Sequence, residues 1–221
     1  ALHRRTEGWI AGLQLAALSL HERDDVQQFV KSFTGSHRYI LDYLIEEVFQ
    51  RQPPRLQDFL LKTSILDRFT AALCDAVAGR DDSRDLLLSL ERANLFIVPL
   101  DRSRQWYRYH RLFADLLRQQ LCRAELDVAV PELHRQASRW YQAEGLQEDA
   151  VRHALAACDW ERTAALILEV EEAMLRRGEV VTLLGWLREL PREVLQRHPQ
   201  LTMSYSWALI LTGQLDDAEA A

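Results

Sequence analysis

The spacing of hydrophobic residues predicts a mostly helical chain. Most windows repeat their apolar positions with the 3.6-residue period of amphipathic helices, and only eight glycines and six prolines are available for turns. The first expected helices are 7–21, 25–33 and 37–51, the last with Ile40, Leu41, Leu44 and Val48 facing inward. Pro53 and Pro54 end that helix, because proline is excluded from a helix interior. We therefore predict a helical domain over residues 1–52.

The next part of the chain, residues 53–125, has the pattern of a winged helix. Three short helices are expected at 54–63, 70–78 and 83–92, with Thr70 as a cap of the second and Asp82 or Ser83 as a cap of the third. Two strand-like runs, Leu95–Leu100 and Trp106–Tyr109, flank a polar turn, and a further helix is expected at 110–123. Three helices followed by one β-hairpin is the element order of a winged helix.

The last part, residues 126–221, contains a helical repeat. Gly145, Gly178 and Gly213 are 33 and 35 residues apart, close to the 34-residue period of tetratricopeptide hairpins, and each is expected to end a helix. Trp140 and Trp207 precede two of these glycines at similar distances, and we expect both tryptophans to fill the space between hairpins. The sequence stops seven residues into the predicted second helix of the third hairpin, so we expect an internal segment of a longer protein.

Charge is distributed unevenly and bears on nucleic-acid binding. Residues 1–123 carry 18 basic and 16 acidic side chains, whereas residues 124–221 carry 9 basic and 17 acidic ones. The acidic part is expected to repel phosphates. The third winged-helix helix, 83–92, has no net charge, so we interpret it as a packing element rather than a DNA-reading helix. Arginines in the wing leave a DNA-binding winged helix as one alternative function.

The sequence lacks the motifs of a self-contained enzyme. It contains no G-x-x-x-x-G-K-[ST] loop, no H-E-x-x-H and no G-x-S-x-G, and no two of its seven histidines have metal-ligand spacing. Cys74, Cys122 and Cys158 are far apart and never form a C-x-x-C pair, which suits a reducing cytoplasm. Glu7 and Gln14 give the N-terminal segment the pattern of an amphipathic helix, not of a secretory signal. We therefore expect a cytoplasmic, non-enzymatic chain without metal or membrane association.

One segment, Asp101–Arg123, has candidate binding chemistry. Six arginines stand there against two aspartates, and His110 opens a helix directly after a strand. An imidazole and free N–H groups at a helix start suit an anion such as phosphate. The alternative is that His110 only caps the helix and that the arginines are a solvated wing. A ring buried among hydrophobic side chains would count against the anion site.

Three collinear motifs resemble the MalT-like, LuxR-type transcriptional activators, which are bacterial signal-transduction ATPases with numerous domains. The motifs are Tyr109–Arg118 (YHRLFADLLR), Thr6–Trp9 (TEGW) and Gly12–Ala16 (GLQLA). The resemblance spans essentially the whole chain. It implies a helical domain that closes an ATPase, a winged helix, and the first hairpins of a superhelical sensor. It also implies an ATPase core before this segment and a helix-turn-helix DNA-binding domain after it.

The resemblance further implies a nucleotide site at the His110 corner. In the wider family a winged-helix histidine contacts the β-phosphate of ADP, and a glycine-leucine-proline-leucine motif packs on adenine. His110 has the histidine's position, while Tyr109 and Arg111 replace its usual methionine and aspartate neighbours, and Gln14 replaces the proline. The expected nucleotide-binding residues are His110, Arg111, Arg108, Gly12, Leu13 and Gln14.

The mechanism implied by the resemblance is a switch between an ADP-bound resting state and an ATP-bound active state. The expected partners are the ATPase domain of the same chain, an inducer at the sensor repeats, and further copies of the protein on activation. DNA would be bound only through the C-terminal domain. A helical-repeat scaffold that binds a protein or peptide partner is the alternative function, and it explains the repeats equally well.

Overall fold

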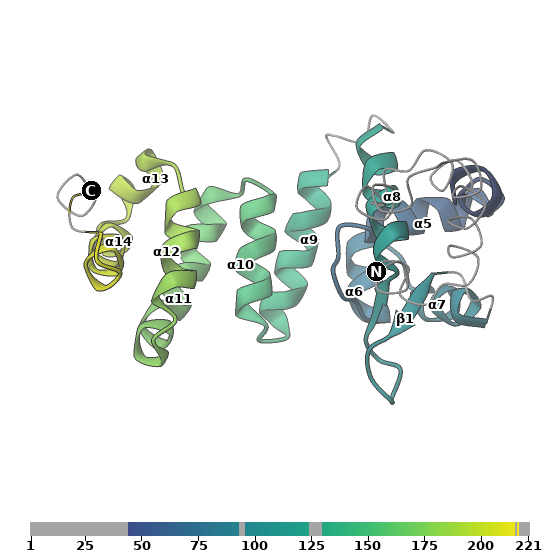
Figure 1. The fold of residues 1–221 in the computed structure, drawn as a ribbon, viewed down its shortest axis with the longest axis horizontal. Helices are drawn as coiled ribbons and strands as arrows, with labels where there is room; N and C mark the ends of the chain where they lie inside the picture. The colour runs from purple at the N-terminus through teal and green to yellow at the C-terminus, as the bar shows by residue number, and fades with distance from the viewer. Residues whose placement is uncertain (1–43, 93–95, 124–129, 215, 217–221) are drawn as a thin grey trace, which may run out of the picture. The chain divides into compact units, whose positions relative to one another are not determined.

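The computed structural model describes residues 44–92, 96–123, 130–214 and 216 (Figure 1). The chain divides into two compact units, residues 1–127 and 128–221. The predicted helices 7–21 and 25–33 lie outside the described residues. Within the described ranges, no helix has both the length and the apolar character that crossing a membrane requires.

The described end of the predicted helix 37–51 is a π-helix, η1 (Leu44–Phe49). The N–H of Gln50 donates to the carbonyl of Ile45 at 2.8 Å, five residues earlier, which is the π-helical pattern. Val48 is buried, as the apolar spacing predicted. The chain then turns before Pro53 and Pro54, so the predicted stop is confirmed while the helix type there differs from the prediction.

Three α-helices follow in the first unit, and their bounds agree with the predicted ones. They are α5 (Pro54–Thr63), α6 (Ala71–Ala78) and α7 (Ser83–Arg92). The Thr70 side chain accepts the N–H of Leu73 at 3.2 Å, so the predicted cap of α6 is confirmed. Leu87 and Leu90 of α7 are each 1% exposed, which agrees with a packing role for this helix.

The predicted hairpin is present with shorter strands. β1 (Ile97–Pro99) and β2 (Tyr107–Tyr109) pair antiparallel, with Ile97 opposite Tyr109. An unpredicted bridge adds Phe69 on the other edge of β2, because Phe69 and Tyr107 exchange two N–H···O bonds of 2.8 Å. β2 is therefore held between β1 and the segment that leads into α6.

Helix α8 (Arg111–Arg123) leaves β2 and closes the winged-helix core. Phe113, Leu116 and Leu117 are at most 1% exposed. Burying side chains of this size contributes about 1.5–3 kcal/mol each. Arg118 joins α8 to the turn after α5, because its guanidinium donates to the Ser64 carbonyl at 2.9 Å and to Asp67 at 2.8 Å.

The second unit is made of helical hairpins, as the glycine spacing predicted (Figure 1). Its described helices are α9 (Val130–Ala143), α10 (Gln147–Ala156), α11 (Trp160–Arg177), α12 (Val180–Glu189), α13 (Arg192–Arg197) and α14 (Pro199–Leu211). Gly145, Gly178 and Gly213 follow α9, α11 and α14 and have φ values of +73°, +78° and +77°. Each glycine supplies the left-handed residue that follows the end of its helix, and in the first two cases the second helix of a hairpin comes next. The mainly α fold class is confirmed.

Two features of this unit differ from the sequence prediction. The six-residue α13 is inserted between α12 and α14, flanked by Pro191 and Pro199. The prediction that tryptophans fill the space between hairpins is wrong for Trp207, which is 52% exposed. Trp140 is only half-buried, and its neighbour Tyr141, 1% exposed, is the core aromatic residue. Helical periodicity alone does not decide which of two adjacent aromatic residues faces inward.

Candidate functional site

The main chain of His110 is fixed at the junction between β2 and α8. Its N–H donates to the carbonyl of Phe96 at 2.7 Å, and its carbonyl accepts the N–H of Ala114 at 2.9 Å. The second of these bonds is the first one of α8. His110 therefore begins the helix after the strand, as the sequence predicted.

The side chain of His110 is largely buried. The residue is 5% exposed, and its ring meets the Phe96 ring edge-on, with centroids 6.4 Å apart. Phe96 in turn stacks on Phe113 at 4.9 Å. The imidazole thus lies against the aromatic side of the winged-helix core, and its Nδ1 atom is buried. This burial counts against contact with a ligand in the present conformation.

The predicted arginines do not converge on His110. Arg111 is exposed, and Arg108 is half-buried and donates to the carbonyl of Tyr109 at 3.2 Å. Arg104 pairs instead with Glu91 at 3.2 Å, in the wing. The predicted residues Gly12, Leu13 and Gln14 lie outside the described residues. His110, Arg108 and Arg111 lie close in the chain, but the Arg108 guanidinium is bonded to the Tyr109 main chain and that of Arg111 is exposed.

Tyr109 is a structural residue of this corner that the sequence marked only as a departure from the family motif. It is 3% exposed, and its ring lies 4.6 Å from that of Phe69 and 6.1 Å from that of Phe113. Its hydroxyl lies 2.6 Å from the Thr63 hydroxyl, which donates to the Phe59 carbonyl. Burial raises the pKa of Tyr109 well above its usual value. The alternation of Tyr107 and Tyr109 in β2 is the signal that could have identified both as inward-facing.

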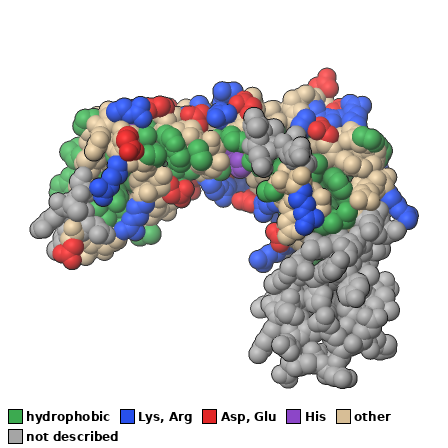
Figure 2. Space-filling view, turned by 90° about the horizontal axis from the view of Figure 1, so that it is seen from above, with side chains coloured by type: hydrophobic (Ala, Val, Ile, Leu, Met, Phe, Trp, Pro, Cys, Tyr) green, Lys and Arg blue, Asp and Glu red, His purple; other side chains and the backbone are tan. Residues whose placement is uncertain are grey.

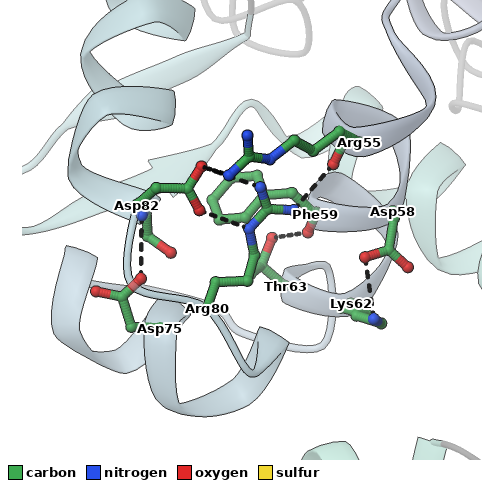
Figure 3. Close-up of polar contacts among 9 residues, drawn as sticks. Arg55, Asp58, Phe59, Lys62, Thr63, Asp75, Arg80 and Asp82 are labelled. Carbon is green, nitrogen blue, oxygen red and sulfur yellow. Dashed lines mark hydrogen bonds and ion pairs between the residues drawn. The ribbon is translucent and has the colours of Figure 1, made fainter.

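A second polar cluster connects α5 with the loop between α6 and α7 (Figure 3). The Arg80 guanidinium donates twice to Asp82, at 2.8 and 3.1 Å, and once to the Arg55 carbonyl at 3.1 Å. Arg55 donates to the same carboxylate at 2.6 Å, and Arg80 lies over the Phe59 ring. The hydrogen bond from Arg80 lowers the pKa of Asp82. This cluster ties α5 to the loop between α6 and α7.

Helix α7 begins after Asp82, but the side chain that caps it is Asp75 and not the predicted Asp82 or Ser83. Asp82 accepts the N–H groups of Asp85 and Leu86 through its main-chain carbonyl, while its carboxylate binds arginines. Asp75, eight residues earlier, accepts the N–H of Ser83 at 3.0 Å. The first N–H of α7 is thus satisfied by a side chain from α6.

Neither a metal cluster nor, on the face shown in Figure 2, a continuous basic patch is present among the described residues. These residues contain no group of three or more histidine, cysteine or acidic side chains that could hold a metal ion. Figure 2 shows Lys and Arg side chains interspersed with acidic ones on the face displayed.

The fold and its elements define a class of protein: a winged helix followed along the chain by helical-hairpin repeats. Residues 45–129 match the family described as MalT winged helix domain. The chain is 35% identical to the HTH-type transcriptional regulator MalT of Klebsiella pneumoniae over 204 residues, 91% of this chain and 22% of that protein. The MalT regulator of Yersinia pestis gives 35% over 203 residues. The resemblance to MalT-like regulators is thereby confirmed.

A second kind of relative matches the same chain. The serine/threonine-protein kinase PknK of Mycobacterium tuberculosis is 35% identical over 228 aligned positions, 100% of this chain and 20% of that protein. The chain therefore spans about a fifth of the length of these relatives. Segments similar to this chain therefore occur in proteins with different named activities.

Proposed function

We propose that this chain is the regulatory segment of an ATP-dependent bacterial transcriptional regulator. The observation that carries the proposal is the similarity to MalT regulators over 91% of the chain, which spans the winged helix and the hairpins. In this role the segment links an N-terminal ATPase domain to a C-terminal helix-turn-helix domain. Inducer binding to the hairpins and nucleotide exchange would then act on one equilibrium that governs self-association and DNA binding.

The donor set at the His110 corner suits the phosphates of a nucleotide in charge and hydrogen-bonding chemistry. Arg111 is exposed, Arg108 is half-buried, and both guanidinium groups are suited to phosphate oxygens. A bound nucleotide supplies the negative charge of its phosphates. Arg111 would attract that charge, and the His110 ring, which is 5% exposed, would have to turn outward to donate one hydrogen bond. Gly12, Leu13 and Gln14 would contribute to the adenine side, as the family resemblance implies.

One charge-assisted hydrogen bond from His110 is worth about 1.5–3 kcal/mol. Since about 1.4 kcal/mol corresponds to a factor of ten, this bond would favour the ADP-bound state roughly ten- to a hundredfold. The inducer would oppose that preference only through its differential affinity for the two states. The segment itself would perform no catalytic step.

The test is ADP retention by the complete protein carrying His110→Ala or Arg111→Ala. We expect both variants to release ADP more readily and to raise basal transcription from a reporter. His198→Ala is the matched control, because His198 lies in the second unit and binds Glu161 at 3.1 Å. Circular dichroism checks that the buried His110 site still folds. Unchanged ADP content in both corner variants would contradict the proposed nucleotide contact.

The match to PknK over the whole chain favours a second candidate function, a regulatory segment within a kinase. The coding sequence on either side of this segment distinguishes the candidates. A Walker loop upstream and a helix-turn-helix downstream support the transcriptional regulator. A kinase domain supports the second candidate, and the absence of all three supports the helical-repeat scaffold.

A further inference from the structure

A cavity of about 460 Å³ lies between the start of α6, helix α7 and the tip of the wing. Its apolar wall includes Leu87, Leu88 and Tyr107, and its polar rim includes Ser103 and Gln105. Its volume is within the range of about 300–1,000 Å³ that small-ligand sites occupy. The cavity is separate from the His110 corner, because His110, Arg108 and Arg111 are not among its lining residues.

Two arginines from different elements line this cavity. Arg84 comes from α7 and Arg104 from the wing turn, and no aspartate or glutamate is among the described lining residues. Arg84 is exposed and makes no ion pair with a described residue, whereas Arg104 pairs with Glu91 at 3.2 Å. The cavity therefore has at least one positive charge that no described carboxylate neutralises.

The wing turn holds Arg104 in a defined position. The Asp101 carboxylate accepts the N–H groups of Gln105 at 3.0 Å and Trp106 at 2.9 Å, and the Ser103 hydroxyl at 2.9 Å. Arg104 itself has φ +53°, a conformation that such a closed turn can impose on a non-glycine residue. Arg104 is thus carried by a turn whose backbone is held by hydrogen bonds to Asp101.

We propose that this cavity is the docking site for an acidic peptide segment of a protein partner, with an aliphatic side chain next to a carboxylate. The aliphatic group would pack on Leu87 and Leu88, and the carboxylate would meet Arg84 and Arg104. Charge complementarity and the apolar wall together select this occupant over duplex DNA. A DNA-reading surface offers a protruding basic helix, whereas α7 also carries Asp85 and Glu91 beside this concave site.

The experiment measures binding of a fluorescein-labelled peptide of four Glu-Leu repeats to the 221-residue chain by fluorescence anisotropy. We expect Arg84→Gln and Arg104→Gln each to weaken binding about tenfold. Arg102→Gln is the matched control, because Arg102 is exposed on the same wing but does not line the cavity. A Gln-Leu peptide should bind at least tenfold more weakly, and added salt should weaken the Glu-Leu complex.

Several outcomes would overturn the proposal. They are absence of peptide binding, equal binding of the Gln-Leu peptide, and equal losses in Arg84→Gln and Arg102→Gln. Displacement of the peptide by random duplex DNA, with loss of DNA binding in the Arg84 variant, would assign the site to nucleic acid instead. Thermal unfolding of each variant shows that a loss of binding is not a loss of fold. The proposal does not depend on the nucleotide switch, so either can fail alone.

Discussion

The hydrogen bond between Tyr109 and Thr63 connects β2 to the end of α5, and replacing the acceptor Thr63 should cost more than replacing the donor Tyr109. Thr63 has one hydroxyl proton, which it donates to the Phe59 carbonyl at 2.7 Å. Tyr109 must therefore be the donor in its 2.6 Å bond to Thr63. Thr63→Val keeps the shape of the side chain but leaves the Tyr109 hydroxyl without that acceptor.

The magnitudes follow from the burial of both groups, since Thr63 is 0% and Tyr109 is 3% exposed. A buried donor left unsatisfied costs about 1–3 kcal/mol, whereas a typical hydrogen bond contributes about 0.5–1.5 kcal/mol net. We expect Thr63→Val to lower the free energy of unfolding by about 2 kcal/mol and Tyr109→Phe by about 1 kcal/mol. The double variant should lose no more than Thr63→Val alone, because it leaves no orphaned hydroxyl.

The assay is urea unfolding of the four proteins at pH 7, followed by far-UV circular dichroism and by tryptophan fluorescence. For a domain of about 60–100 residues, such as the winged helix predicted at 53–125, a change of about 1 kcal/mol in the free energy of unfolding shifts the melting temperature by about 4–8 °C. Thermal unfolding therefore gives an independent check. A double variant that loses the sum of the two single effects would refute the inferred donor direction. Equal effects of both single substitutions would refute it as well.

Two further predictions concern the glycines and the wing turn. Gly178→Ala should destabilise the second unit by about 1 kcal/mol because φ is +78°, whereas Gly185→Ala, in open space on α12, should stabilise it by about 0.5–1 kcal/mol. Melting temperatures of the two variants test the difference in sign. In the wing, N–H groups of Gln105 and Trp106 lower the pKa of Asp101. Its contribution is complete above the unfolded pKa of about 3.9 and is lost as pH falls through the folded value. Asp101→Asn should therefore have a lower free energy of unfolding than wild type above about pH 4, and this difference should shrink as the pH falls and the Asp101 carboxylate is protonated. The same pH dependence of unfolding in variant and wild type would contradict this.

Local sequence signals were sufficient for most helices of the first unit. The double proline before α5 and the capping threonine before α6 are short-range effects, so their bounds follow from neighbouring residues. The positive φ values of Gly145, Gly178 and Gly213, three of the four described glycines with positive φ, are predictable for the same reason, because the backbone requirement is local. These elements need no knowledge of what packs on them.

Features that depend on distant partners were not predictable. The Phe69 bridge is a single residue pair, which leaves no alternating pattern in the sequence. The Thr63–Tyr109 bond joins residues 46 positions apart. The burial of His110 depends on Phe96, which the strand pattern placed in the hairpin without showing its direction. For the candidate site, sequence therefore located the corner but not the accessibility of its ring.

The two candidate sites of the winged helix are connected through β2. Tyr107 at one end of this strand lines the cavity, and His110 follows Tyr109 at the other. At about 3.3 Å per residue, these positions are roughly 10 Å apart along the chain. Both ends are anchored, because Tyr107 exchanges two hydrogen bonds with Phe69 and Tyr109 is hydrogen-bonded to Thr63.

We expect a strand held in this way to transmit a displacement at one end to the other. A peptide in the cavity and a nucleotide at the His110 corner should therefore influence each other's affinity. Thr63→Val, which removes one anchor, should weaken that mutual influence without changing either set of contacting side chains. Equal coupling in wild type and variant, measured as the change in peptide affinity on adding ADP to the complete protein, would show that β2 does not carry it.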